Sequence, residues 1–203
     1  MSETPAKRGR PRTFDRAAAL AAATLLFWER GYEGTSIGEL TEVMGIRSGS
    51  LYAAFGDKTS LFREVVSSYG ESPYGAFAGV ALAQEPTAYG ACARLLREAA
   101  VVFPDPSHPA GCLTICAAAN VAPQDTEVAE FLRVLRNDNL AALEERLRRA
   151  QEEGELPPGA SPAALAAYVA TVFQGMSQRA RDGATAVELT ETAELALTAW
   201  PTR

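Results

Sequence analysis

The 203-residue chain has few of the features that mark membrane or secreted proteins. It contains three cysteines without the spacing of a disulfide framework, which argues for reduced thiols. No run of about 18 uncharged apolar residues occurs, so we expect no membrane span. The basic N-terminus has no apolar stretch behind it, which argues against a secretory signal. These absences predict a cytoplasmic protein that makes no contact with a membrane.

Signals of β-structure are also scarce. Runs of β-branched residues are rare and no segment alternates with period two, whereas alanine recurs throughout. The hydrophobic content of 47% and charged content of 22% are those of an ordinary globular chain. We therefore predict an all-α protein of about nine helices. The expected ranges are 15–30, 37–44, 48–55, a helix that begins at 58 and ends or kinks around 70–79, and then 86–103, 110–120, 125–153, 161–182 and 185–199.

Charge is divided unevenly along the chain. Residues 1–68 carry nine Lys and Arg against eight Asp and Glu, whereas residues 69–203 carry ten against seventeen. This asymmetry would turn the N-terminal part toward phosphate. Residues 1–13 are expected to form a basic, disordered arm that contains Arg8, Arg10 and Arg12. We interpret this arm either as a hook for an A·T-rich minor groove or as a solubilising tail.

The strongest motif lies between residues 31 and 58. A helix closed by Gly45 is followed, after Ile46, by a second short helix, and two helices joined so closely cross at a large angle. The second helix can then project from the surface into a major groove. Leu51 and Phe55 are four residues apart and should face the core, which leaves Ser48, Ser50, Tyr52 and Ala53 facing outward. This pattern is typical of a helix-turn-helix.

The span 14–66 resembles the DNA-binding domain of TetR/AcrR-family transcriptional regulators. The matching fragments are Gly31-Tyr32-x-x-Thr35-Ser36, Met44-Gly45-Ile46, Ser50-Leu51-Tyr52-x-x-Phe55 and Asp57-Lys58-x-x-Leu61-Phe62. The resemblance implies that residues 67–203 form a helical ligand-binding and dimerisation domain. It also implies a homodimer, joined through the helices at 161–182 and 185–199, on a pseudo-palindromic DNA operator. The expected function is that of a repressor released by a small molecule or by thiol modification.

The resemblance assigns roles to individual residues. Thr35 or Ser36 would offer a hydroxyl and a backbone N–H to a phosphate, Tyr52 would offer its hydroxyl, and Lys58 would add charge at a helix start. Gly49 would permit close approach of the backbone. The candidates for reading base edges are Arg47, Ser48, Ser50 and Ala53, with Arg47 suited to guanine. Two departures stand out, because many members have a small hydroxyl residue in place of Arg47 and a histidine in place of Ala54.

A second feature is the segment 108–116. On a helix, Cys112 and Cys116 would share a face, and Cys112 would lie near the positive N-terminus, which favours the reactive thiolate. The Gly111-Cys112 pair resembles a subset of TetR-like regulators whose cysteine senses electrophiles or oxidants. The alternatives are two buried core thiols, a zinc site that adds His108 and Cys92, and an enzyme with Cys112 as nucleophile and His108 as base.

An ordinary ligand cavity is the other expectation for this half. The residues predicted to line it are Cys112, Cys116, Phe103, Asn120, Phe131, Tyr168 and Phe173, and further candidates are Tyr74, Phe77, Ile115, Gln174 and Met176. We expect a small-molecule or electrophile effector there, and no catalytic residue, metal or cofactor. An architectural DNA protein conflicts with the acidic residues 69–203.

Overall fold

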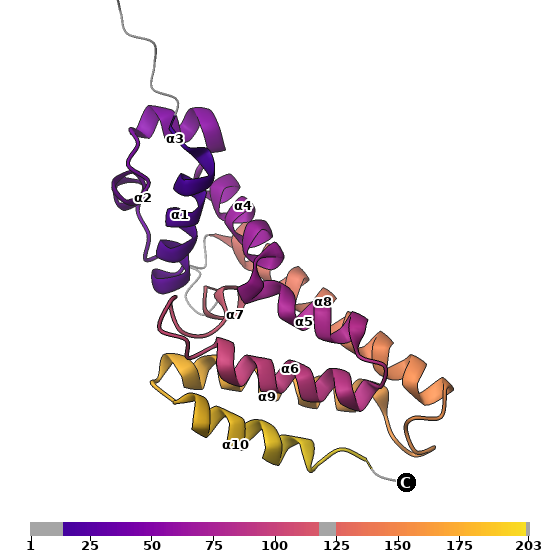
Figure 1. Ribbon diagram of the computed structural model, residues 1–203. Coiled ribbons are helices and arrows are strands. Elements are labelled where there is room, and N and C mark those ends of the chain that lie inside the picture. Colours follow the sequence, from indigo (N-terminus) through magenta and orange to yellow (C-terminus); the bar gives the residue numbers. More distant parts are fainter. Residues whose placement is uncertain (1–13, 118–124, 202–203) are drawn as a thin grey trace, which may run out of the picture.

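The computed structural model describes residues 14–117 and 125–201. Within these residues the chain forms ten helices and no strand (Figure 1), in agreement with the predicted all-α fold. The helices are α1 Arg16–Arg30, α2 Ile37–Val43, α3 Ser48–Phe55, α4 Lys58–Glu71, α5 Pro73–Gln84, α6 Ala88–Val102, α7 Leu113–Cys116, α8 Thr126–Glu152, α9 Pro162–Arg181 and α10 Ala186–Leu197. The predicted arm 1–13 and Asn120 lie outside the described residues.

The first four helices begin and end where the sequence predicts. The Asp15 carboxylate accepts hydrogen bonds from the first turn of α1, and Gly31 ends that helix with a φ of +74°. Ser36 and Glu39 form the reciprocal capping box at the start of α2. The Asp57 carboxylate accepts a hydrogen bond of 2.7 Å from the Ser60 backbone N–H at the start of α4. Local capping chemistry therefore fixes the frame of the N-terminal unit.

Burial of aromatic and leucine side chains holds these helices together. Phe27 of α1 and Phe62 of α4 meet edge to face with ring centroids 5.1 Å apart. Leu40 of α2 and Leu51 of α3 are fully buried in the same cluster. This packing presents α3 at one end of the molecule (Figure 1).

The remaining helices form a second body beyond α4. In Figure 1, α4 leads into α5 alongside the long helix α8, while α6, α9 and α10 form a layer beneath them. The most extensive helix contacts join α8 to α9, α10 to α6 and α5 to α6. The small helix α7 packs against α1, α4, α8 and α9, so it lies between the N-terminal unit and the rest. No helix in the described part of the chain has the length and apolar character needed to cross a membrane.

Two helices differ from the prediction. The sequence predicts that the fourth helix ends or kinks around residues 70–79. This region instead contains the start of a separate helix, α5, which begins at Pro73, a favourable residue for a first helical turn. The helix expected at 110–120 is a single turn, α7, within the described residues. Gly111 prevents an earlier start of the helix, because its φ of +82° is not helical. Glycine is favoured at this position because a Cβ would lie 2.7 Å from the Ser177 carbonyl oxygen. The predicted boundary between residues 66 and 67 falls inside α4 and stays a prediction.

Candidate nucleic-acid interface and adjoining cavity

The exposed side of α3 is made of the residues expected to face outward. Arg47, Ser48, Gly49 and Tyr52 are exposed, and Ser50 is partly buried. Arg47 is the N-cap residue of α3 but makes no capping hydrogen bond with its side chain. The guanidinium is therefore available to a partner outside the helix. Leu51 and Phe55 face the core as predicted.

The stability of the fold alone does not explain the glycine at position 49 or the exposed tyrosine at position 52. A Cβ at Gly49 would meet nothing within 4 Å, so the fold itself does not require glycine there. Tyr52 is 51% exposed, which is high for an aromatic side chain on a short helix. This exposure leaves the side chain accessible to a partner outside the protein.

Thr35 is not the phosphate-binding hydroxyl that the resemblance implied. It is 1% exposed, and its hydroxyl donates to the Gly31 carbonyl oxygen at 2.8 Å. This bond satisfies the backbone at the end of α1, so the side chain has a structural role. Ser36 is exposed, although its backbone N–H donates to Glu39 at 2.9 Å. Its phosphate contact stays a prediction.

Lys58 stands at the first position of α4, as predicted, with its ammonium above an aromatic ring. Its Nζ lies 4.1 Å from the centroid of the Tyr32 ring. Burial lowers the pKa of Lys58, and the carboxylates of Glu33, Asp125 and Glu39 oppose that effect. Tyr32 is held in turn by a hydrogen bond of 2.9 Å between its hydroxyl and that of Thr59. The ammonium is thus positioned by the fold at the helix start.

Arg16 belongs to the fold rather than to the basic arm. Its Nη2 donates to Glu64 Oε2 at 2.8 Å, and its guanidinium lies 4.4 Å from the centroid of the Phe55 ring. The side-chain hydrogen bond to Glu64 raises the pKa of Arg16. Arg16 therefore ties α1 to α3 and α4. The sequence alone did not reveal this role.

A cavity of about 880 Å³ lies beside this unit, bordered by α4, α5, α7, α8 and α9. Its volume is in the range of small-molecule sites, about 300–1,000 Å³. Three of the residues predicted to line it do so, namely Cys112, Phe131 and Phe173. Tyr74, Phe77, Ile115 and Gln174 also line it, as expected. The sequence thus located the cavity in outline.

Three other residues that were predicted to line the cavity do not line it. Phe103 is fully buried behind it, with its ring 5.0 Å from that of Phe173. Cys116 packs on Ser177 at 3.6 Å, and burial raises the pKa of its thiol. Tyr168 donates its hydroxyl to the Ala196 carbonyl oxygen at 3.3 Å, so it joins α9 to α10. Met176, a further candidate, is buried away from the lining.

Several lining residues escaped the sequence analysis. Tyr69, Thr114, Arg136 and Asn139 all border the cavity. Arg136 follows Leu132 by four residues and precedes Leu143 by seven, which places it on the apolar side of α8. The sequence signal that could have identified Arg136 is a positively charged residue within the apolar stripe of this helix.

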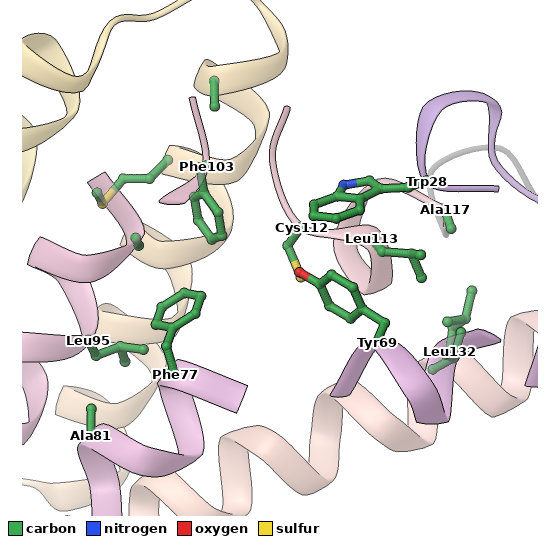
Figure 2. Close-up of a cluster of buried hydrophobic side chains, with 14 of the residues drawn as sticks. Trp28, Tyr69, Phe77, Ala81, Leu95, Phe103, Cys112, Leu113, Ala117 and Leu132 are labelled. Atoms are coloured by element: carbon green, nitrogen blue, oxygen red, sulfur yellow. The ribbon is translucent and has the colours of Figure 1, made fainter. Parts of the chain in front are cut away.

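Cys112 connects the cavity to α1. The Tyr69 hydroxyl oxygen lies 3.5 Å from Cys112 Sγ, and Figure 2 shows this hydroxyl directed at the sulfur. The same hydroxyl lies 3.1 Å from the Tyr74 carbonyl oxygen. The Tyr69 ring meets Trp28 of α1 edge to face, with centroids 4.9 Å apart. Burial, with a smaller contribution from Cys112, raises the pKa of Tyr69, so the hydroxyl remains a donor. Trp28 also stacks on His108 at 4.5 Å.

The zinc and enzyme hypotheses lack the required geometry. No group of three or more His, Cys, Asp or Glu side chains that could hold a metal occurs within residues 14–117 and 125–201. His108 Nδ1 lies 2.9 Å from the Pro109 carbonyl oxygen, and the sulfur of Cys112 has Tyr69 and Thr114 as its polar partners. The thiol therefore has no histidine base. Cys112 also precedes the one-turn helix α7 as its N-cap, so the expected activation by a long helix lacks its basis.

Comparisons with known proteins assign the chain to a family. Residues 19–65 match the family model described as bacterial regulatory proteins of the tetR family, and residues 92–194 match the C-terminal domain model described as tetracyclin repressor-like. The HTH-type transcriptional repressor ComR of Escherichia coli is 34% identical over 194 residues, which cover 96% of this chain and 92% of ComR. The HTH-type transcriptional repressor BdcR of the same organism is 29% identical, with 93% and 90% covered.

Solved structures agree with this assignment. A cysteine mutant of the TetR family regulator CifR, complexed with 26-base-pair operator DNA, superposes with a TM-score of 0.89. It is 41% identical, and the match covers 95% of this chain and all of that one. These relatives are transcriptional regulators rather than enzymes. The chain belongs to the TetR family and is a DNA-binding transcriptional regulator.

Proposed function

We propose that the protein is a repressor that binds a pseudo-palindromic operator as a homodimer and leaves it when the cavity is filled or Cys112 is modified. The observation that carries this proposal is the contact of Cys112 with Tyr69, and of Tyr69 with Trp28. These contacts join the cavity to a helix of the DNA-binding unit. The curated relatives ComR and BdcR are named as repressors, which supports the direction of control.

In this proposal α3 enters the major groove. Arg47 and Ser48 lie at its exposed N-terminal end, where recognition helices contact base edges. Arg47 would read guanine through two hydrogen bonds. Ser36, Tyr52 and Lys58 would contact phosphates, which fix the position of the protein on the duplex.

The second copy would be bound through α9 and α10. Val187 and Leu195 of α10 are 68% and 72% exposed, and Tyr168 of α9 is 39% exposed. Large apolar side chains exposed on neighbouring helices are typical of a surface that a partner covers. A twofold dimer would hold its two α3 helices about 34–36 Å apart, one turn of DNA.

Release would begin at Cys112. This cysteine lines the cavity, whereas Cys92 and Cys116 do not. Burial raises the pKa of Cys92 to about 12, which suppresses its thiolate at neutral pH. A group attached to the Cys112 sulfur would displace the Tyr69 hydroxyl and disturb the packing of Tyr69 on Trp28. The resulting shift of α1 would favour a state whose two α3 helices no longer match successive grooves.

Operator capture tests the DNA half of the proposal. The purified protein is incubated with randomised duplex DNA, and the retained duplexes are sequenced. We expect an inverted repeat with half-sites about 10–10.5 base pairs apart. Recovery of no enriched sequence contradicts the proposal.

Thiol modification tests the release half. Binding to the captured duplex is measured before and after treatment with N-ethylmaleimide, for the wild type, Cys112→Ser and Cys116→Ser. We expect the wild type and Cys116→Ser to lose binding and Cys112→Ser to keep it. Equal loss in Cys112→Ser would show that the sulfur of Cys112 is not the site of release.

A further inference from the structure

Three side chains that carry a formal charge line the cavity, and they differ in their partners. Arg63 Nη2 donates to Glu127 at 2.7 Å, so its charge is compensated. Glu71 is exposed at the last position of α4. Arg136 is partly buried, and no carboxylate of the described residues lies in ion-pair contact with it. Arg136 is thus the uncompensated cation of the cavity.

The protein gives the Arg136 guanidinium few hydrogen bonds to replace those that it would make with water. Its Nη1 makes one long hydrogen bond, 3.5 Å, to the Thr114 carbonyl oxygen. Burial lowers the pKa of Arg136, and no nearby carboxylate opposes that effect. A guanidinium has five N–H donors in a planar fork, so most of them are left for solvent or a ligand. Such a group in a mainly apolar cavity is costly unless an anion binds it.

We propose that the cavity binds an apolar monocarboxylic acid, with its carboxylate on Arg136 and its body between Phe131, Leu140 and Phe173. The fork of Arg136 matches a carboxylate with two parallel hydrogen bonds. A single uncompensated cation balances one negative charge, whereas a phosphate monoester would bring a second charge without a partner. The apolar lining residues supply the remaining surface.

The position of Arg136 links such a ligand to the release path. The carbonyl oxygen of Thr114 accepts from Arg136, and the Thr114 hydroxyl lies 3.2 Å from Cys112 Sγ. A carboxylate on Arg136 would therefore act next to Cys112 and α7, which packs on α1. This inference rests on the proposed function, because it names the class of effector that fills the same cavity.

The test compares acids with alcohols of the same skeleton. A panel of unbranched, branched and aromatic monocarboxylates of six to fourteen carbons, each paired with its alcohol, is titrated into the full chain, and binding is measured by the shift in Tm. We expect at least one acid to bind about 10–100-fold more tightly than its alcohol, because a charge-assisted pair is lost with the alcohol. Arg136→Gln should remove that preference and leave alcohol binding within about twofold.

Two variants control for charge and for fold. Arg133→Gln removes a cation from the exposed side of α8, where Arg133 pairs with Glu130, and should keep the preference for acids. Arg136→Lys keeps the charge without the fork and should fall between the wild type and Arg136→Gln. The proposal is overturned if no acid of the panel binds, if acids and alcohols bind equally, or if the preference for acids persists in Arg136→Gln.

Operator release is measured separately, so that the two proposals can fail independently. If an acid binds through Arg136 but leaves operator binding unchanged, the carboxylate site stands and release by cavity filling fails. If acids and alcohols release the operator equally from the wild type and Arg136→Gln, release stands and the carboxylate site fails.

Discussion

Tyr52 and Tyr69 show two uses of the same side chain. Tyr52 is about half exposed on α3, whereas Tyr69 is buried with its hydroxyl on the sulfur of Cys112. A buried hydroxyl must find a partner inside the protein, whereas an exposed one remains available to a ligand. In the proposed function, Tyr52 would contact DNA and Tyr69 would transmit the signal from the cavity.

Tyr52→Phe should weaken operator binding about 2–10-fold, because one hydrogen bond to a phosphate is lost. The loss should be similar for all duplexes, since phosphates carry no base identity. Fluorescence anisotropy with the captured operator and a scrambled duplex measures both affinities. Tyr89→Phe, on the exposed side of α6, is the matched control and should bind as the wild type does. An unchanged affinity in Tyr52→Phe contradicts its assigned role.

Cys92 should resist alkylation in the folded protein. Burial raises its pKa to about 12, so its thiolate becomes appreciable only as the pH approaches that value. Iodoacetamide at pH 7 and pH 8.5, followed by peptide mass spectrometry, should label Cys112 and leave Cys92 unmodified. Labelling of Cys92 as fast as Cys112 would contradict the proposed selectivity of the thiols.

At the scale of helices, the side chain that caps the first turn decides where a helix begins, and the Asp57 cap of α4 is the clearest case. The hydrogen bond from the Ser60 backbone N–H lowers the pKa of Asp57 from its ordinary value of 3.8. The ionised carboxylate therefore stabilises the folded state above that value, and this contribution is lost as the pH falls through the lowered folded pKa. The same residue begins the helix that carries Lys58 and Tyr69.

Asp57→Ala should lower the free energy of unfolding at pH 7 by about 1 kcal/mol, the usual effect of losing an N-cap. Asp57→Asn should lose less, because an amide oxygen also caps a helix. Urea unfolding at pH 7 and at pH 2.5 measures the difference. The gap between the wild type and Asp57→Asn should shrink at the lower pH, and a gap that widens there would contradict this role of the carboxylate.

The elements that were predicted well are those with local signals. Capping residues and glycines placed α1 to α4 within a few residues, because these signals act over one helical turn. α5 was missed because Gly75 and Gly79 reduce helix propensity, and its burial against α6 is a tertiary effect. α7 was overextended because Gly111 has a φ of +82°, and the backbone N–H of Cys112 donates to the hydroxyl of Ser177, 65 residues further along the chain.

In the candidate site, too, features with local signals were predicted and features that depend on tertiary packing were missed. The surface of α3 could be predicted, because a short helix with one buried side leaves few choices for the other. The cavity was predicted in part, since apolar spacing does not distinguish Phe131, which lines it, from Phe103, which packs behind it. Thr35 was assigned wrongly because its bond to Gly31 depends on the end of another helix.

At the scale of the whole molecule, the proposed dimer would supply the symmetry that a pseudo-palindromic operator requires. Leu195→Glu should convert the dimer to a monomer, because a charge would be placed in an apolar interface. Size-exclusion chromatography with light scattering measures the mass, and operator affinity should fall with it. Val134→Glu on α8, which is also exposed, should stay dimeric. A dimeric Leu195→Glu protein contradicts the proposed interface.

In the proposed function, Cys112 and the DNA-binding surface are coupled. Coupling is reciprocal, so operator DNA must disfavour the state in which the thiol is open to attack. The most direct measurement is the rate at which N-ethylmaleimide labels Cys112, with and without saturating operator duplex and with a scrambled duplex as control. We expect the operator duplex, but not the scrambled duplex, to slow labelling by about fivefold or more, in line with typical coupling energies. Equal rates with operator and scrambled duplex would contradict it.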